Sequence, residues 1–309
     1  MLGVAVLGSL NMDLVVETPQ PAGPGETREG TRFYATPGGK GANQAVAAAR
    51  ILGQRAPVTM VGRVGRDPYG DELIASLQAA GVGTKYVRRD PTRNSGVAVI
   101  FIDAQGENYV NAVYGANGCC DEQQVADARE ALKDAAVLLV QQEIPLDVTL
   151  KAMTGARKSG VTVILNPAPM RSSLPDGFLA ACDFLTPNAH EAAELSGFPV
   201  DSVDAARRAA LQIRRTGPAT VIVTLGHLGA WVEGKNISEL VPAPSVPVVA
   251  TVGAGDAFNG GLAAGLAMGL DLLEALHLGV AAGALCVTRA GAQEAMPTFA
   301  ETEHLLGQE

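Results

Sequence analysis

The sequence has few aromatic residues and is rich in small and β-branched ones. Phe, Trp and Tyr make up 4% of its 309 residues, whereas Gly alone occurs 36 times. A Val-rich parallel sheet covered by closely packed helices is compatible with this composition. Because apolar residues make up 47% and charged residues 18% of the chain, we expect a large core and little disorder.

Basic residues are also in short supply. The chain has 23 Lys and Arg against 32 Asp and Glu, which gives a net charge of −9. An acidic protein repels polyanions, so we expect no nucleic-acid partner. A small phosphorylated ligand is compatible with this charge, because backbone amides can bind phosphate without lysines.

Long apolar runs and paired cysteine motifs are missing. No apolar run approaches the roughly 20 residues that span a bilayer, so we expect no membrane partner. Met1–Leu10 has no basic residue before its apolar run, which indicates a first β-strand and not a signal peptide. The four cysteines, Cys119, Cys120, Cys182 and Cys286, show no CxxC spacing. We therefore expect them to be reduced thiols, as in a cytoplasmic protein.

Strand-like and helix-like segments alternate along most of the chain. This alternation predicts an α/β fold with a mainly parallel sheet and helices on both faces. Predicted strands are Val4–Leu7, Val58–Val61, Ala136–Val140, Val161–Leu165, Asp183–Leu185 and Thr220–Thr224. Predicted helices include Ala42–Leu52, Asp71–Ala80, Gly255–Leu270 and Leu272–Thr288.

Two stretches break this rhythm, residues 14–36 and 93–113. They lack helical periodicity and carry short alternating apolar runs between Gly, Asn and Pro residues. Two structureless loops of this length would be unusual in a compact domain. We therefore predict that they form a small lid of a few antiparallel strands, and that residues 1–13, 37–92 and 114–309 form the large α/β domain.

Polar residues follow five of the predicted strands. A single Asn or Thr in such a place is more often a helix cap. Ligands, however, bind beyond the carboxyl ends of strands in an open parallel sheet, so five polar endings at one edge predict a cleft. These residues are Asn11, Asp13, Gln141, Gln142, Glu143, Asn166, Asn188, Glu191 and Thr224.

Two glycine-rich segments lead into predicted helices. Gly38–Asn43 does not fit a P-loop, because Lys40 is followed by Gly instead of Ser or Thr. Gly253–Asp256 does not complete G-x-G-x-x-G, because the last position is Phe258, so a dinucleotide site is poorly supported. Amides at a helix N-terminus can still bind an anion. The simplest role for an Asp in the first turn of a helix is to interact with the helix dipole. Beside a bound phosphate, however, its carboxylate repels the phosphate oxygens, which favours a role in which it accepts a proton.

Sequence motifs along nearly the whole chain point to one family. GGKGANQA and GAGDAFNG together are highly specific. The chain resembles the ribokinases, within the PfkB-type carbohydrate kinases, which implies a ribokinase-like fold with a small β-sheet lid. The motifs are Gly8–Asp13 (GSLNMD), Gly25–Thr27 (GET), Gly38–Ala47 (GGKGANQAVA), Gly115–Asn117 (GAN), Gln142–Pro145 (QEIP), Asn166–Pro169 (NPAP), Thr186–Asn188 with Glu191 (TPNxxE), Thr224–Gly226 (TLG), Gly253–Gly260 (GAGDAFNG) and Val287–Gln293 (VTRAGAQ).

The resemblance implies a role for each matching position. Asp256 would deprotonate a sugar hydroxyl, and the amides of Gly253, Ala254 and Gly255 would form an anion hole for the transferred phosphoryl group. Asn188 and Glu191 would organise Mg²⁺ and phosphate through water, and Thr224 and Gly226 would lie along the ATP. The sugar hydroxyls would be held by Asn11, Asp13, Gly39, Lys40, Asn43 and Glu143. The resemblance also implies a homodimer that pairs through the exposed edges of the lid.

The sequence departs from the family at an activating cation site. The family usually has an Asp where this chain has Ala250, and a Ser where it has Ala295. Hard cations need charged or numerous oxygens, so we predict weakened or absent K⁺ activation. The remaining ligands would be backbone carbonyls around Val252, Cys286, Arg289 and Gly291.

Several functions remain open on the sequence. D-ribose phosphorylated at its 5-hydroxyl is the leading prediction, because Asn11 with Asp13 favours a sugar with a free 2-hydroxyl. A kinase for 2-deoxyribose, fructose or a nucleoside such as adenosine is the alternative within the class. A non-catalytic sugar-binding regulator is the alternative outside it, although a pure binder would not need Asp256.

Overall fold

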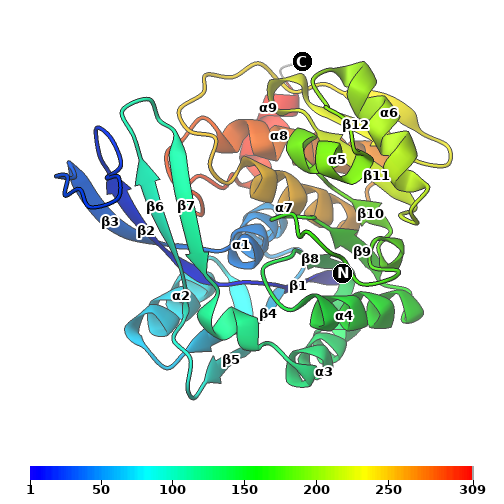
Figure 1. Cartoon of the computed structure of the whole chain (residues 1–309). Coiled ribbons are helices and arrows are strands. Elements are labelled where there is room, and N and C mark those ends of the chain that lie inside the picture. The colour runs from blue at the N-terminus through cyan, green and yellow to red at the C-terminus, as the bar shows by residue number, and fades with distance from the viewer. Residues whose placement is uncertain (308–309) are drawn as a thin grey trace.

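The computed structural model describes residues 1–307. Its main sheet comprises β1 (Gly3–Leu7), β4 (Val58–Gly65), β5 (Val82–Asp90), β8 (Ala135–Val140), β9 (Thr162–Leu165), β10 (Phe184–Leu185), β11 (Thr220–Thr224), β12 (Ala230–Glu233) and β13 (Ser238–Val241). Their order is β13-β12-β11-β10-β9-β8-β1-β4-β5 (Figure 1). Pairing is parallel from β5 through to β11, and β12 and β13 add an antiparallel end.

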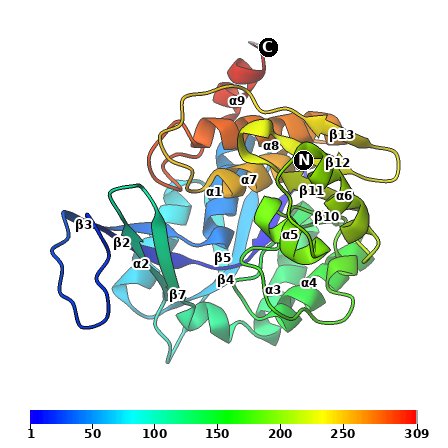
Figure 2. The ribbon, with the colours of Figure 1, turned by 45° about the horizontal axis from the view of Figure 1, so that its top comes forward.

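Helices cover both faces of this sheet because its strands are buried on both sides. In β1, Val4 and Val6 pack into one core, and Ala5 and Leu7 into the other, as the two-residue period of a strand requires. The first core is shared with α1 (Lys40–Leu52), α2 (Pro68–Ala79), α7 (Ala254–Ala267) and α8 (Leu272–Cys286). The second is shared with α3 (Glu122–Ala131), α4 (Leu146–Lys158), α5 (Ala189–Ser196) and α6 (Val203–Arg214). Figure 2 shows α7 and α8 on one side of the sheet and α3 and α4 on the other.

The predicted fold class is therefore confirmed. Predicted strands and helices agree with the observed ones to within a few residues, except that β4 extends to Gly65. The prediction missed β5, β12 and β13, which lie toward the two ends of the sheet. A last helix, α9 (Phe299–Leu306), follows α8 and packs on it.

A second, four-stranded sheet lies beside the main one. It comprises β2 (Asn11–Glu17), β3 (Arg32–Gly38), β6 (Gly96–Ile102) and β7 (Asn108–Val113), in the order β3-β2-β6-β7 (Figure 1). The strands lie in and next to the two stretches predicted as a lid. The division of the chain into two domains stays a prediction.

The predicted antiparallel pairing of this small sheet is wrong for its central pair. β2 pairs with β6 in parallel, from Asn11 opposite Gly96 to Glu17 opposite Ile102. The reason is topological: β2 follows β1 and β6 follows β5, and these two strands of the main sheet run in the same direction. Both chain segments therefore enter the second sheet from the same end.

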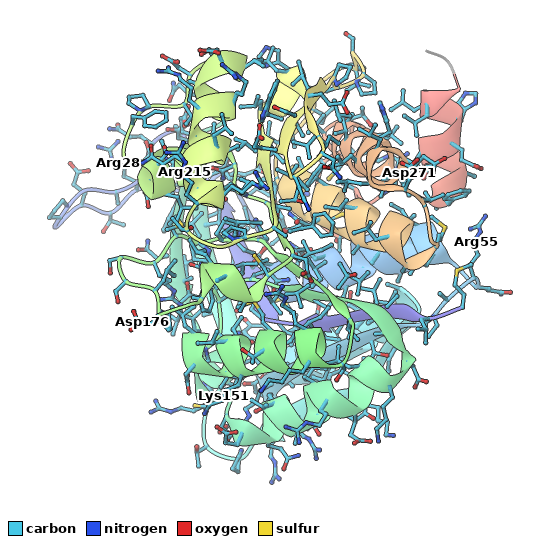
Figure 3. All side chains as sticks on the ribbon, turned by 90° about the vertical axis from the view of Figure 1, so that its right-hand side faces the viewer. Arg28, Arg55, Lys151, Asp176, Arg215 and Asp271 are labelled. Carbon is cyan, nitrogen blue, oxygen red and sulfur yellow. The ribbon has the colours of Figure 1, made fainter. Side chains whose placement is uncertain are left out.

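Charged side chains lie mainly at the periphery of the fold. Arg55, Lys151 and Asp271 are exposed and project from the outside of the ribbon (Figure 3). Among residues 1–307, no helix has both the length and the apolar character needed to cross a membrane.

Candidate active site

Asp256 lies where the carboxyl edge of the main sheet meets the starts of α1 and α7. It occupies the first turn of α7 and is 8% exposed. Its Oδ2 accepts a hydrogen bond from Asn43 Nδ2 at 3.0 Å, and its Oδ1 accepts one from Gln44 Nε2 at 2.9 Å. Both donors come from α1, so the carboxylate is held at the junction of two helices.

The glycine before this helix has a backbone conformation that other residues avoid. Gly253 is the N-cap of α7 with φ 80°, in the left-handed region. This turn brings Gly253, Gly255 and Asp256 to the wall of one cavity. The first N–H groups of a helix have no intrahelical acceptor, so this helix end can bind an anion.

That cavity has a volume of about 220 Å³ and is open to solvent. It brings together residues from the starts of α1 and α5, the ends of β9, β10 and β11, the turn before α7, and α7 itself. The lining residues are Lys40, Asn166, Ala168, Thr186, Asn188, Glu191, Thr224, Thr251, Gly253, Gly255, Asp256 and Asn259. Seven of them were predicted as site residues.

The predicted sugar-binding residues adjoin this cavity. Glu143 Oε2 accepts hydrogen bonds from the Ser9 hydroxyl and, at 3.1 Å, from the Lys40 N–H. Asn11 is buried, and its Oδ1 accepts a hydrogen bond from Asn117 Nδ2 at 2.8 Å. The Asn11 amide nitrogen is therefore the part of this side chain that can donate to a ligand.

Acidic groups crowd this part of the site. Burial, together with the charges of Glu143 and Asp256, raises the pKa of Asp13 to about 7. Burial works to lower the pKa of Lys40, but the charges of Asp256, Glu143 and Glu191 outweigh it, and the net pKa is raised. Lys40 is therefore a permanent cation among carboxylates, and it can offset the charge of a phosphorylated ligand.

Asn188 and Glu191 form the capping box of α5. The Asn188 N–H donates to Glu191 Oε2 at 2.9 Å, and the Glu191 N–H donates to Asn188 Oδ1 at 2.8 Å. A parallel bridge also joins Asn188 to Thr224, at the end of β11. Each side chain of the box keeps a second polar atom for a ligand at the cavity wall.

The oxygens at this wall suit Mg²⁺ bound largely through water. Mg²⁺ keeps several waters and uses one or two carboxylates together with substrate phosphates. Burial raises the pKa of Glu191, so a nearby cation would favour its ionised form. In residues 1–307 no three His, Cys, Asp or Glu side chains cluster as direct ligands for a metal.

The predicted monovalent-cation residues lie on the other flank of the turn. The Cys286 thiol donates to the Val252 carbonyl at 3.6 Å, and the Arg289 N–H donates to the Cys286 carbonyl at 3.2 Å. The Arg289 guanidinium forms an ion pair with Glu301, so this side chain does not contribute to the predicted cation site. Gly291 has φ 95°, and the residues of this flank do not line the cavity.

Two other predicted positions also lie outside the cavity wall. Gly226 begins a short 3₁₀ turn after β11, and Ala254 begins α7 between two lining glycines. The sequence placed Asn166 at the predicted cleft without a specific role, and it did not single out Gln44 and Asn259, which contact Asp256 or line the cavity. A signal for both was present, because Gln44 lies in the family motif Gly38–Ala47 and Asn259 in the family motif Gly253–Gly260.

Comparisons with known proteins agree with this geometry. The model of the pfkB family carbohydrate kinases matches residues 1–299. The ribokinase of Bacillus subtilis is 40% identical over 306 residues, which cover 99% of this chain and 100% of that protein. The deoxyribokinase of Salmonella typhi is 37% identical over 305 residues, covering 99% of each chain.

A solved structure is similar over the same length. The structure of Arabidopsis thaliana ribokinase complexed with ribose and ATP superimposes with a TM-score of 0.91 at 32% identity. The match covers 99% of this chain and 98% of that one.

Proposed function

The chain belongs to the pfkB family of carbohydrate kinases and is a sugar kinase, and on that premise we propose that it phosphorylates the 5-hydroxyl of D-ribose with ATP. The observation that carries the proposal is a buried carboxylate, Asp256, beside the first amides of α7. No side chain caps this helix end, and the Ala254 N–H makes only a long hydrogen bond of 3.4 Å to the Thr251 carbonyl. A base and an anion site within one helical turn are what phosphoryl transfer to an alcohol requires.

In the proposed reaction, Asp256 takes the proton of the sugar 5-hydroxyl. The oxygen then forms a bond to the γ-phosphorus of ATP as the bond to the β–γ bridging oxygen breaks, and ADP leaves. The amides of Gly253, Ala254 and Gly255 donate to the equatorial oxygens of the transferred group. Most of the rate comes from alignment and charge stabilisation, because the protein forms no covalent bond to the phosphoryl group.

Charges around the phosphates come from two more groups. Lys40 faces the cavity as a cation and offsets negative charge on the phosphates. Mg²⁺, held through water by Asn188 and Glu191, would neutralise phosphate oxygens when bound. Thr224 lines the cavity beside Asn188, which supports the proposed nucleotide position, and Gly226 follows it in the chain.

We propose ribose as the preferred sugar because polar side chains of the site would form hydrogen bonds with its hydroxyls. Asn11, Asp13, Asn43 and Glu143, with the Gly39–Lys40 backbone, supply acceptors and donors next to the base. A site built around a hydroxyl penalises a sugar that lacks it, since a buried polar group then loses its partner. The similarity to a deoxyribokinase makes 2-deoxyribose the second candidate.

Turnover on four acceptors tests this specificity. We expect the highest kcat/KM for ADP formation with ribose, followed by 2-deoxyribose, and much lower values with fructose and adenosine. A higher kcat/KM with 2-deoxyribose would change the proposed substrate but not the assignment as a sugar kinase. Sugar binding without any ATP-dependent phosphorylation would support the non-catalytic regulator.

We also propose a cytoplasmic homodimer. The four cysteines are unpaired, as is usual in a reducing compartment. Every residue of β7 is exposed at an edge of the second sheet, and Phe33 of β3 is 66% exposed at the other edge. Such edges favour pairing with a second copy. A monomer by light scattering at micromolar concentration would contradict this.

A further inference from the structure

The orientation of Asp256 depends on Gln44, a residue with no role in the proposed chemistry. Gln44 is fully buried, and its amide donates to Asp256 Oδ1 at 2.9 Å. Hydrogen bonds to a carboxylate are roughly twice as strong as neutral ones. We propose that Gln44 is a positioning residue that fixes the Asp256 carboxylate for proton transfer. This inference rests on the sugar-kinase function proposed above.

The amide of Gln44 can face Asp256 in only one way. Its Oε1 accepts a hydrogen bond from Gln141 Nε2 at 2.6 Å, and its Nε2 also donates to Asn166 Oδ1 at 3.0 Å. If the amide were reversed, its oxygen would face the oxygens of Asp256 and Asn166, and its nitrogen would face the Gln141 nitrogen. The surroundings thus keep the donor directed at the carboxylate.

The partners of Gln44 are anchored in the centre of the main sheet. Gln141 directly follows β8, and Asn166 directly follows β9. Asn166 Nδ2 donates to the Thr186 carbonyl at 3.1 Å, which turns its Oδ1 toward Gln44. A functional side chain held through rigid strands is positioned more exactly than one held by loops.

Gly8, which directly follows β1, provides the space for this arrangement. A Cβ at Gly8 would lie 2.0 Å from Gln141 Oε1, far inside van der Waals contact. Any side chain there would displace Gln141 and remove the hydrogen bond that orients Gln44. The chain of contacts Gly8–Gln141–Gln44–Asp256 therefore runs from β1 through β8 and α1 to α7, and we call it the amide chain.

The amide chain acts on the chemical step because a base must present a free lone pair to the hydroxyl. Asn43 holds Oδ2 and Gln44 holds Oδ1, so the carboxylate cannot rotate about its Cβ–Cγ bond. Without Gln44 the carboxylate would sample orientations in which the proton is out of reach. Ground-state binding of sugar and ATP uses other groups and should be unaffected.

The experiment compares kcat with KM in two variants. Gln44→Met keeps the length of the side chain and removes its donors, and we expect kcat to fall about tenfold or more while both KM values stay unchanged. Gln141→Met keeps Gln44 but removes its anchor, and we expect a smaller fall in kcat of the same kind. The Gln141 variant decides the question if the Gln44 variant does not fold.

A matched control separates positioning from general loss of stability. Gln124 on α3 is also fully buried, and its Oε1 accepts from the Asp121 N–H and from Arg63. Gln124→Met should lower the melting temperature and leave kcat unchanged. Wild-type kcat in both Gln44→Met and Gln141→Met, or an effect on KM alone, overturns the positioning role.

Asp256→Asn distinguishes failure of this inference from failure of the proposed function. A wild type without ATP-dependent sugar phosphorylation defeats both. An active wild type, an inactive Asp256→Asn and a fully active Gln44→Met defeat the positioning role alone.

Discussion

The two flanks of the turn at residues 250–256 are built from different groups. On the downstream flank, two buried amides hold the Asp256 carboxylate, and Lys40 lines the same cavity. On the upstream flank, Ala250 and Val252 contribute no side-chain oxygen, and Val252 is 42% exposed. One flank is thus equipped with ionised and hydrogen-bonded side chains. The other offers a cation no carboxylate, because the Thr251 hydroxyl is the side-chain oxygen of residues 250–252 and the remaining oxygens are backbone carbonyls.

The proposed catalytic groups and the proposed site for an activating cation therefore lie on different flanks of the turn. The proposed base and anion site depend on α1, α7 and the strand ends, which pack in the core beside the main sheet. A monovalent cation on the upstream flank would compete with internal contacts, because the Cys286 thiol and the Arg289 N–H already bond to carbonyls there. We therefore expect the downstream flank to be essential for turnover and the upstream flank to be nearly dispensable.

The largest effect is expected from removing the base. Asp256→Asn keeps the shape of the side chain, accepts no proton, and should lower kcat by about 10²–10⁴-fold. Sugar binding, measured by calorimetry, should persist because other groups hold the hydroxyls. Near-normal turnover in this variant would remove Asp256 from the mechanism.

A smaller loss of activity is expected from a change at the proposed Mg²⁺ site, Asn188 and Glu191. Glu191→Gln should raise the Mg²⁺ concentration for half-maximal activity by about 10–100-fold, because one carboxylate is lost from the ion's surroundings. A titration of activity with MgCl₂ measures this. Glu194→Gln is the control, since Glu194 lies on the same helix and pairs with His190 at the surface. An identical Mg²⁺ response in both variants would contradict the assignment.

Restoring a carboxylate upstream should make the two flanks more alike. Ala250→Asp adds a charged oxygen beside the carbonyls, so K⁺ should stimulate this variant several-fold more than the wild type. Ala250→Asn controls for the size of the new side chain. The same K⁺ response in all three proteins would show that the missing carboxylate is not what limits the site.

The smallest effect concerns stability and its dependence on pH. The pKa of Asp13 is raised from 3.8 to about 7, so its stabilising contribution is complete below pH 4 and is lost as pH rises through 7. Asp13→Asn cannot ionise and should gain on the order of 1 kcal/mol or more relative to the wild type between pH 5 and pH 8. Melting curves at these two pH values measure the gain, and an equal difference at both would contradict it.

Local sequence patterns are the physical basis of the predictions for the downstream flank. Glycine-rich segments before helices and polar residues after parallel strands are local patterns, and the carboxyl ends of parallel strands meet at one edge. Asp256 and Glu191 were singled out in this way and Lys40 through the family resemblance, and the cavity brings all three together. Their roles remain proposals that the variants test.

Long-range contacts could not be predicted in the same way. Nothing in the run Ala42–Ala45 shows that Gln44 meets Gln141 and Asp256, because these partners are set by how α1 packs on the sheet and α7. The parallel pairing of β2 with β6 likewise depends on two strands 85 residues apart at Asn11 and Gly96. The strand β5 was missed because its Lys and Arg residues mask any apolar alternation.

Ribose-dependent ADP formation in sodium-free Tris buffer, with and without added K⁺, tests the contrast between the flanks most directly. We expect clear turnover without K⁺ and little change on its addition. A strict K⁺ requirement, or no ribose-dependent turnover under either condition, would contradict it.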